Sequence, residues 1–179
     1  MEHSPIEHTL LPFRRRWHVI DEADIARLLA DHARMRELCQ DLESLADRLC
    51  GHLPLHERCA AADRLQETML DHVKATSTFF GQVFRGERLS YEGGVLARIL
   101  TRQIADAIHA EDVADALREE VLDAADINIL AYMLRCVFEN CRRALDFEQL
   151  SLLSIAAHRL TAAARTSLQQ LLARPQDVC

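Results

Sequence analysis

The chain has 179 residues, of which 49% are hydrophobic and 27% are charged, and its formal net charge is -7 at pH 7. This length and apolar content suit one domain with one well-filled core. The acidic balance argues against a general nucleic-acid-binding protein, because such proteins need a stripe of Lys and Arg to neutralise phosphates. No apolar stretch approaches the ~20 residues of a membrane span, and the N-terminus lacks the basic start and apolar run of a signal peptide. We therefore expect a cytoplasmic protein that binds neither nucleic acid nor a membrane.

Glycine and proline are scarce, at 5 and 4 residues, so turns should be few and the elements between them long. Within these elements the apolar residues recur at three- and four-residue steps, which is the spacing of an amphipathic helix. We predict an all-α fold, an up-down-up-down four-helix bundle over residues 21–160. An N-terminal arm over residues 1–20 should precede the bundle, and a short C-terminal helix and tail over residues 161–179 should follow it.

The arm carries the only basic cluster of the chain, Arg14 to Arg16, which lies between Phe13 and Trp17. Such a segment could contact a membrane surface or an acidic partner. The interpretation that we favour is that the aromatic side chains of the arm pack on the bundle.

The first two long helices are predicted over residues 21–50 and 55–84. Asp21 or Asp24 offers the side-chain acceptor that caps the first of them. Residues 85–94 contain three glycines and little apolar content, so they are predicted to form a loop. The residues expected to face the core from these two helices are Ile25, Leu28, Leu29, His32, Met35, Cys39, Leu42, Ala46 and Leu49, then Leu65, Met69, His72, Ala75, Thr76, Phe79 and Val83.

The third and fourth long helices are predicted over residues 95–122 and 127–160. Asp123 or Asp126 is expected to cap the fourth helix, and Thr161 the short C-terminal one. The residues expected to face the core are Leu96, Ile99, Leu100, Gln103, Ala107 and Ala110, then Leu130, Leu134, Val137, Cys141, Ala144, Leu145, Glu148, Leu152 and Ile155.

Three of the four inward faces carry one ionisable residue near the middle of the helix, and these are His32, His72 and Glu148. The remaining face carries Gln103. Mid-helix positions of an antiparallel bundle lie at similar depth, so we expect these four side chains to meet in one layer. Because an unpaired buried carboxylate costs several kcal/mol, Glu148 should have either hydrogen-bonding partners or a cation beside it.

Three segments carry a family resemblance, which covers most of the chain. They are LLADHARMRELCQDLESLADRL, MLDHVKATSTFFGQVF and RRALDFEQLSLLSIAAHRL. These segments resemble the bacterial hemerythrin-like (HHE cation-binding) proteins. The resemblance implies a four-helix bundle that holds a non-haem di-iron centre with histidines and bridging carboxylates. Members of that family bind oxygen, or respond to oxygen, nitric oxide or iron.

Only half of the ligands that the resemblance implies are present. The first-helix histidine of the family falls on His32, and the histidine of the second-helix HxxxE motif falls on His72. Glu148 matches the glutamate of the fourth-helix HxxxE motif. The other family ligands fall on Thr76, Gln103 and Ala144. Two iron ions need several carboxylates to offset their charge, so we do not expect the usual di-iron centre.

Two hypotheses follow. The first is a hemerythrin-like bundle with a vestigial metal centre and no cofactor, in which the polar core layer is a hydrogen-bonded network of His32, His72, Glu148, Gln103 and Thr76. Such a protein would be a non-catalytic interaction or regulatory module with a protein partner of unknown identity. That partner could also be a second copy of the chain, which would make a homodimer. The alternative is a protein that binds one Fe or Zn ion through His32, His72 and Glu148 and senses or carries a small ligand such as oxygen or nitric oxide. A di-iron redox enzyme ranks below both.

Other candidate residues receive less weight. Asp106, one turn from Gln103, could add an oxygen ligand but is expected to face solvent. The cysteines Cys39, Cys136 and Cys141 are expected to act as small reduced hydrophobes, since no CxxC pair is present. No nucleotide-binding loop, hydrolase elbow or HExxH motif occurs, so we expect no catalytic residues. The histidines expected at the surface are His52, His56, His109 and His158.

Overall fold

A computed structural model describes residues 19–51, 53–84 and 91–172, with the side chains of residues 91 and 92 excepted. Within these ranges the protein is all-α, as predicted, and an isolated bridge between Ile20 and Leu160 is its one extended pairing. The helices are α1 (Glu22–Arg48), α2 (Leu55–Val83), α3 (Tyr91–Arg118), α4 (Ala124–Ile155) and α5 (Ala162–Leu172), and the 3-10 turn Leu49–Gly51 follows α1.

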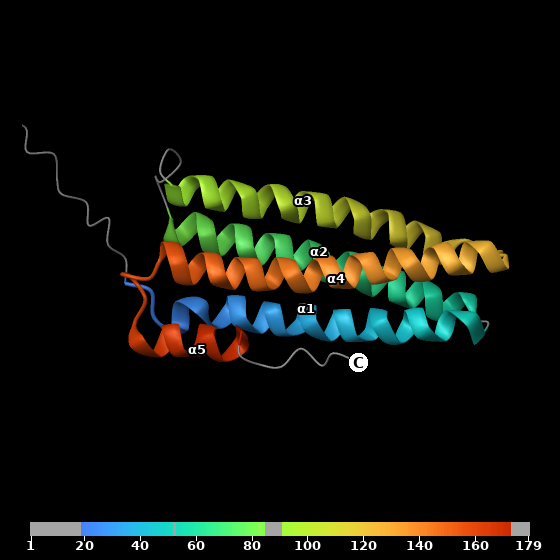
Figure 1. Ribbon diagram of the computed structural model, residues 1–179, viewed down its shortest axis with the longest axis horizontal. Helices are drawn as coiled ribbons and strands as arrows, with labels where there is room; N and C mark the ends of the chain where they lie inside the picture. The colour runs from blue at the N-terminus through green and yellow to red at the C-terminus, as the bar shows by residue number, and fades with distance from the viewer. Residues whose placement is uncertain (1–18, 52, 85–90, 173–179) are drawn as a thin grey trace, which may run out of the picture.

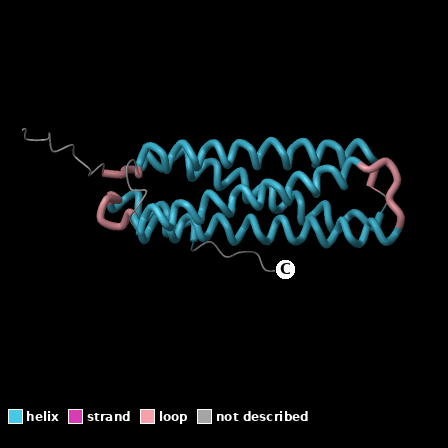
Figure 2. The backbone as a smooth tube through the Cα atoms, turned by 90° about the horizontal axis from the view of Figure 1, so that it is seen from above, coloured by secondary structure: helices cyan, strands magenta, loops and turns pink. Residues whose placement is uncertain are grey.

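The four long helices form an up-down-up-down bundle (Figure 1). Around the bundle, α1 packs against α2 and α4, and α3 packs against the same two helices on the other side. Loops join the helices at the two ends of the bundle (Figure 2). The short helix α5 folds back at one end and packs on α1 and α4. None of the described helices has the length and apolar character that crossing a membrane would require.

Side-chain caps start three of the helices. The carboxylate of Asp21 accepts a hydrogen bond from the backbone N–H of Asp24 at 3.0 Å, and the Asp24 carboxylate accepts one from the backbone of Asp21 at 3.1 Å. The pair Asp123 and Asp126 forms the same reciprocal arrangement before α4. Each cap satisfies amides that have no partner within the helix. Asp21 is therefore the N-cap of α1 and Asp123 the N-cap of α4, each being the first of the two candidates predicted for its helix. Thr161 caps α5 as predicted.

Two predicted boundaries are wrong in α3. The helix begins at Tyr91 rather than at residue 95, and it ends at Arg118 rather than at residue 122. Gly93 and Gly94 therefore lie in the first turn of a helix and not in a loop. Glycine destabilises a helix because it loses more backbone conformational freedom than other residues, and it is better tolerated at a helix end than in the middle.

The fourth helix ends at Ile155, five residues before the predicted end. The chain turns there because residues 159–161 pair with the segment before α1. The backbone N–H of Ile20 donates to the carbonyl of Arg159 at 2.8 Å, and the N–H of Thr161 donates to the carbonyl of Ile20 at 3.0 Å. Ile20 is fully buried at this contact. The rest of the predicted arm, residues 1–18, lies outside the described part of the chain.

The buried apolar residues form two clusters, one on each side of a polar layer. One cluster includes Leu28 of α1 and Leu152 of α4, and the other includes Met35 of α1 and Leu145 of α4. On both helices the buried residues between these positions are all polar, and α2 and α3 show the same interruption. The bundle therefore has apolar packing above and below a single polar level near its middle.

Candidate functional site

The polar layer draws side chains from all four long helices. Its members are Asp31, His32, His72, Thr76, Gln103, Glu148 and Gln149, each at most 3% exposed. Leu, Met, Phe and Ile side chains of the two apolar clusters close the layer from both ends of the bundle. Water is thereby kept from these groups, so each polar atom needs a partner within the protein.

Glu148 lies at the centre of the layer. One carboxylate oxygen is 3.1 Å from Nε2 of His32, and the other is 3.4 Å from Nε2 of His72 and accepts a hydrogen bond from the amide of Gln103 at 2.8 Å. Burial alone would raise the pKa of Glu148, but the hydrogen bonds from the two histidines outweigh it and lower that pKa to about 2. Glu148 is therefore ionised at neutral pH. The structure thus brings together the four residues from which the polar layer was predicted.

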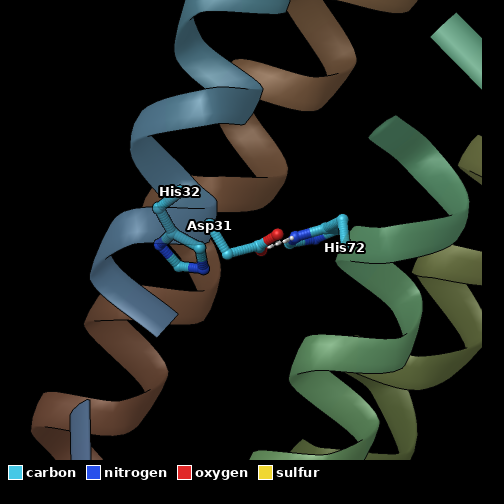
Figure 3. A group of neighbouring side chains, drawn as sticks. All are labelled: Asp31, His32 and His72. Atoms are coloured by element: carbon cyan, nitrogen blue, oxygen red, sulfur yellow. Dashed lines mark hydrogen bonds and ion pairs between the residues drawn. The ribbon is translucent and has the colours of Figure 1, made fainter. Parts of the chain in front are cut away.

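His72 is held between two carboxylates. Its Nδ1 lies 2.6 Å from Oδ2 of Asp31, and Figure 3 shows these two side chains facing each other across α1 and α2. Burial opposes the charged imidazolium, but the hydrogen bonds to Asp31 and Glu148 prevail and raise the pKa of His72 to about 9. The second oxygen of Asp31 accepts from the half-exposed Arg34 at 3.1 Å. At neutral pH the layer therefore contains an imidazolium with an anionic partner on each side.

The orientation of the Gln149 amide sets the tautomer of His32. Arg36 has only N–H groups to offer, and its Nη2 lies 3.3 Å from Oε1 of Gln149, so that oxygen faces Arg36. The NH2 group of the same amide then faces Nδ1 of His32 at 2.8 Å and donates to it. Nδ1 of His32 is consequently an acceptor, and Nε2 carries the hydrogen that points to Glu148.

Three positions that would supply ligands in the resembled family carry residues of other types here. The Thr76 hydroxyl donates to the carbonyl of His72, one turn back in its own helix, at 2.7 Å, and also lies 3.1 Å from the Gln103 amide oxygen. The Gln103 NH2 group is bound to Glu148. Ala144 is buried at 6% exposure and has no donor atom. With Glu148 and Asp31 as the carboxylates of the layer, the residues present do not fit a di-iron centre.

Asp31 is a member of the site that the sequence-based prediction missed. Ligand atoms of Asp31, His32 and His72 lie within 4.8 Å of one another, so this buried group could hold a metal ion. A signal was present, because Asp31 stands three residues after Leu28 and four before Met35, on the flank of the inward stripe. Gln149 was missed as well, and the same kind of signal was present, because it stands four residues after Leu145.

The remaining candidates lie elsewhere. The expectation that Asp106 faces solvent is wrong: its side chain is only 12% exposed, and it pairs with Arg102 at 3.6 Å. Burial raises the pKa of this carboxyl. Asp106 is not part of the buried group that could hold a metal within the described residues. As expected, Cys39 and Cys141 are buried, Cys136 is partly so, and exposed histidines are His56, His109 and His158, while His52 lies outside the described residues.

Comparisons with protein-family models, with curated proteins and with solved structures found no match to this chain. The hemerythrin-like resemblance therefore rests on the helix order and on the positions of His32, His72 and Glu148.

Proposed function

We propose that this protein is a hemerythrin-like bundle in which protons and hydrogen bonds take the place of a metal centre, and that it works through its surface as a non-catalytic interaction or regulatory module. The observation that carries the proposal is the pair of contacts from Arg36 to Gln149 and from Gln149 to His32. These contacts put a hydrogen on the His32 nitrogen that faces Glu148, where a ligand atom would need a free lone pair.

Metal binding at His32 would disturb this arrangement. If Nε2 of His32 bound a metal, the ring hydrogen would move to Nδ1 and would face the NH2 group of Gln149. To accept that hydrogen, the Gln149 amide would have to turn over. Its NH2 group would then face the Arg36 guanidinium, which is also a donor. Either orientation leaves two donors opposed, and unpaired buried donors cost about 1–3 kcal/mol each.

The positive charge on His72 also opposes metal binding. Its imidazolium already supplies a positive charge between Asp31 and Glu148, at contacts of 2.6 and 3.4 Å. A metal ion would have to displace a proton whose pKa is raised to about 9. At pH 7 that competition lowers the apparent metal affinity ~100-fold.

The interaction role is supported by apolar side chains on the outer side of α4. Tyr132 is 69% exposed, Leu150 is 56% exposed, and Ile129 and Phe147 are also exposed. Tyr132 and Leu150 are 18 residues apart, as are Ile129 and Phe147, and ~18 residues make five helical turns, so all four side chains share one side of the helix. These two exposed apolar pairs, one toward each end of the helix, offer apolar area for a protein contact on this side of α4.

A second copy of the chain is the simplest occupant for this side of α4. Sedimentation across a concentration series should then show a dimer for the natural sequence and a monomer for Tyr132→Glu with Leu150→Glu. A matched control is Val121→Glu, which alters an 84% exposed residue outside α4. A natural chain that stays monomeric at all concentrations contradicts the homodimer and directs the search to a different protein.

The test of the polar layer compares the natural protein with Gln149→Glu. The new carboxylate can accept a hydrogen from Nδ1 of His32 and still pair with Arg36, so Nε2 of His32 becomes free to bind a metal. We expect metal content by mass spectrometry, on protein purified without an affinity tag, to be substoichiometric for the natural chain. Titration with Fe(II) or Zn(II) should show that Gln149→Glu binds the metal more tightly than the natural chain does. One equivalent of metal retained by the natural chain would contradict the proposal.

A second candidate function is the binding of one Fe or Zn ion, and one observation favours it. Nε2 of His32 and Nε2 of His72 lie 3.1 and 3.4 Å from the Glu148 carboxylate oxygens, and ligand atoms ~2.0–2.2 Å from one zinc ion are ~3–3.5 Å apart. Asp31 behind His72 also resembles the carboxylate that commonly orients a ligand histidine. An ion held there would offer open positions for a small ligand such as oxygen or nitric oxide. Loss of bound metal in His72→Gln would select this candidate.

A further inference from the structure

Three sulfur atoms from three helices gather in the larger apolar cluster, away from the polar layer. Cys39 of α1, Met69 of α2 and Cys141 of α4 are each at most 3% exposed. The Cys141 thiol points to the Met69 sulfur, with the two sulfurs 3.9 Å apart, and Cys39 and Cys141 lie close enough that each thiol shifts the pKa of the other. Cys39 is seven residues after His32, so this sulfur cluster lies about 10 Å along the bundle from that histidine.

We propose that Cys39, Met69 and Cys141 form a binding site for one soft monovalent metal ion, Cu(I) in the first place. Thiolate and thioether sulfurs are the ligands that select Cu(I), and a thioether contributes little to the binding of harder ions. Three sulfurs placed about 2.3 Å from a central ion in a trigonal plane would be about 4.0 Å apart. The 3.9 Å contact between Cys141 and Met69 already has that spacing.

The charge around the cluster suits a singly charged ion. The nearby Cys141 thiol lowers the pKa of the Cys39 thiol, burial acts in the opposite direction, and the charges of Arg142 and Arg36 lower that pKa further. The same contact and burial raise the pKa of Cys141. Cys39 is therefore the thiol of the pair that loses its proton first. A monovalent ion on the Cys39 thiolate leaves the buried site neutral, whereas a divalent ion would also require the proton of Cys141 to leave.

This site does not depend on the function proposed for the polar layer. Its donors are sulfur atoms, while the donors of the polar layer are imidazole nitrogens and carboxylate oxygens, which favour harder ions. The two sites also lie at different levels of the bundle, so a variant in one leaves the ligands of the other in place. Failure of one proposal is therefore distinguishable from failure of the other.

The experiment uses a full-length chain in which Cys50, Cys59, Cys136 and Cys179 are replaced by Ser, so that Cys39 and Cys141 are the remaining thiols. Anaerobic titration with Cu(I), delivered from a coloured chelator that competes for the ion, should show one ion bound per chain. X-ray absorption should show sulfur ligands at about 2.3 Å and no nitrogen ligands. A chain that binds no Cu(I), or binds it through nitrogen, overturns the proposal.

Variants in this background assign the ligands. Cys39→Ala with Cys141→Ala should lose the ion, and Met69→Leu, which keeps the volume of the side chain, should weaken binding at least ~10-fold. The matched control Met133→Leu alters a partly buried methionine that packs on the same cluster and should leave the affinity unchanged. His72→Gln should also leave it unchanged. Circular dichroism checks that each variant is folded. Unchanged Cu(I) affinity in folded Met69→Leu and in the folded double cysteine variant would overturn the proposal.

Discussion

At the scale of single residues, the charges of the polar layer are stabilised by one another. Asp31 and Glu148 are 2% exposed, and His72 is 3% exposed, so none of them is hydrated by bulk water. Isolated charges in such surroundings are costly, but His72 bonds both carboxylates, and Arg34 bonds the outer oxygen of Asp31. Removal of one member leaves its partner buried and unpaired, so substitutions in this layer should couple strongly.

The charge of His72 makes stability depend on pH above neutrality. Its pKa is raised from 6.5 to about 9 in the folded protein, so its contribution is fully present below pH 6.5 and is lost as pH rises through 9. We expect the free energy of unfolding to fall by up to about 3 kcal/mol over this range, measured by denaturant titration. His72→Gln, the control, should lack this loss. Parallel curves for the two proteins would mean that His72 is not charged in the core.

An acidic counterpart is expected for Glu148, whose pKa is lowered from 4.5 to about 2. Its contribution is present above pH 4.5 and is lost as pH falls through 2. In Glu148→Gln, the free energy of unfolding should fall less steeply than in the natural protein as pH drops below 4.5. The shifts of His72 and Glu148 both include the contact between these two residues, so their contributions are not added.

The contact of 3.1 Å between His32 and Glu148 predicts non-additive effects on stability. We expect the double variant His32→Ala with Glu148→Ala to lose less stability than the sum of the two single variants, with a coupling of ~0.5–3 kcal/mol. Denaturant unfolding of the four proteins measures the coupling. Strict additivity would show that these two side chains do not interact.

At the scale of helices, local sequence signals fix where α1 and α4 begin. Each helix starts with a reciprocal pair of aspartates three residues apart, and both pairs are exposed, so they act without support from the core. By contrast α2 starts at Pro54, which provides no side-chain cap. The start of α4 is therefore a site where stability depends on one surface residue.

Removal of this cap gives a prediction with a matched control. Asp123→Ala should lower the free energy of unfolding by about 1 kcal/mol, because two amides at the start of α4 lose their acceptor. Glu120→Ala removes the same charge three residues earlier, outside a helix, and should change stability by less than about 0.5 kcal/mol. Equal effects of the two changes would assign the loss to charge rather than to capping.

At the scale of the whole molecule, two apolar clusters hold the four helices in register independently of the polar layer. Thr76, Gln103 and Ala144 are nevertheless all buried at the level of the layer, at 0%, 3% and 6% exposure. The bundle therefore presents these three positions inward, although none of them carries a histidine or carboxylate side chain.

Restoring ligand residues at these positions tests the resemblance. The triple variant Thr76→Glu, Gln103→His and Ala144→His should be destabilised without metal, because it buries ionisable groups that have no partners. Added Fe(II) or Zn(II) should raise its midpoint of thermal unfolding, since binding at 100 times Kd contributes about 2.7 kcal/mol. The natural chain is the control. If the folded triple variant binds no ion and its midpoint does not move, the assignment of family positions to these residues is wrong.

The sequence by itself determined the fold class, the helix order and the inward positions of His32, His72 and Glu148. It could do so because helical periodicity and capping are local properties of the chain, and because the middles of antiparallel helices must meet. The end of α4 was not predictable from local signals, since the pairing of Ile20 with the segment around Leu160 brings together residues far apart in the chain.

Only the tertiary structure decided which atoms face each other in the polar layer. Asp31 and Gln149 lie on the flanks of their helices, and whether such positions are buried depends on the neighbouring helix rather than on their own sequence. The hydrogen on His32 is placed by Gln149, which is in turn oriented by Arg36. The sulfur cluster likewise needs three helices in register. Contacts of this kind depend on side-chain directions to within an ångström, and helical periodicity carries no such information.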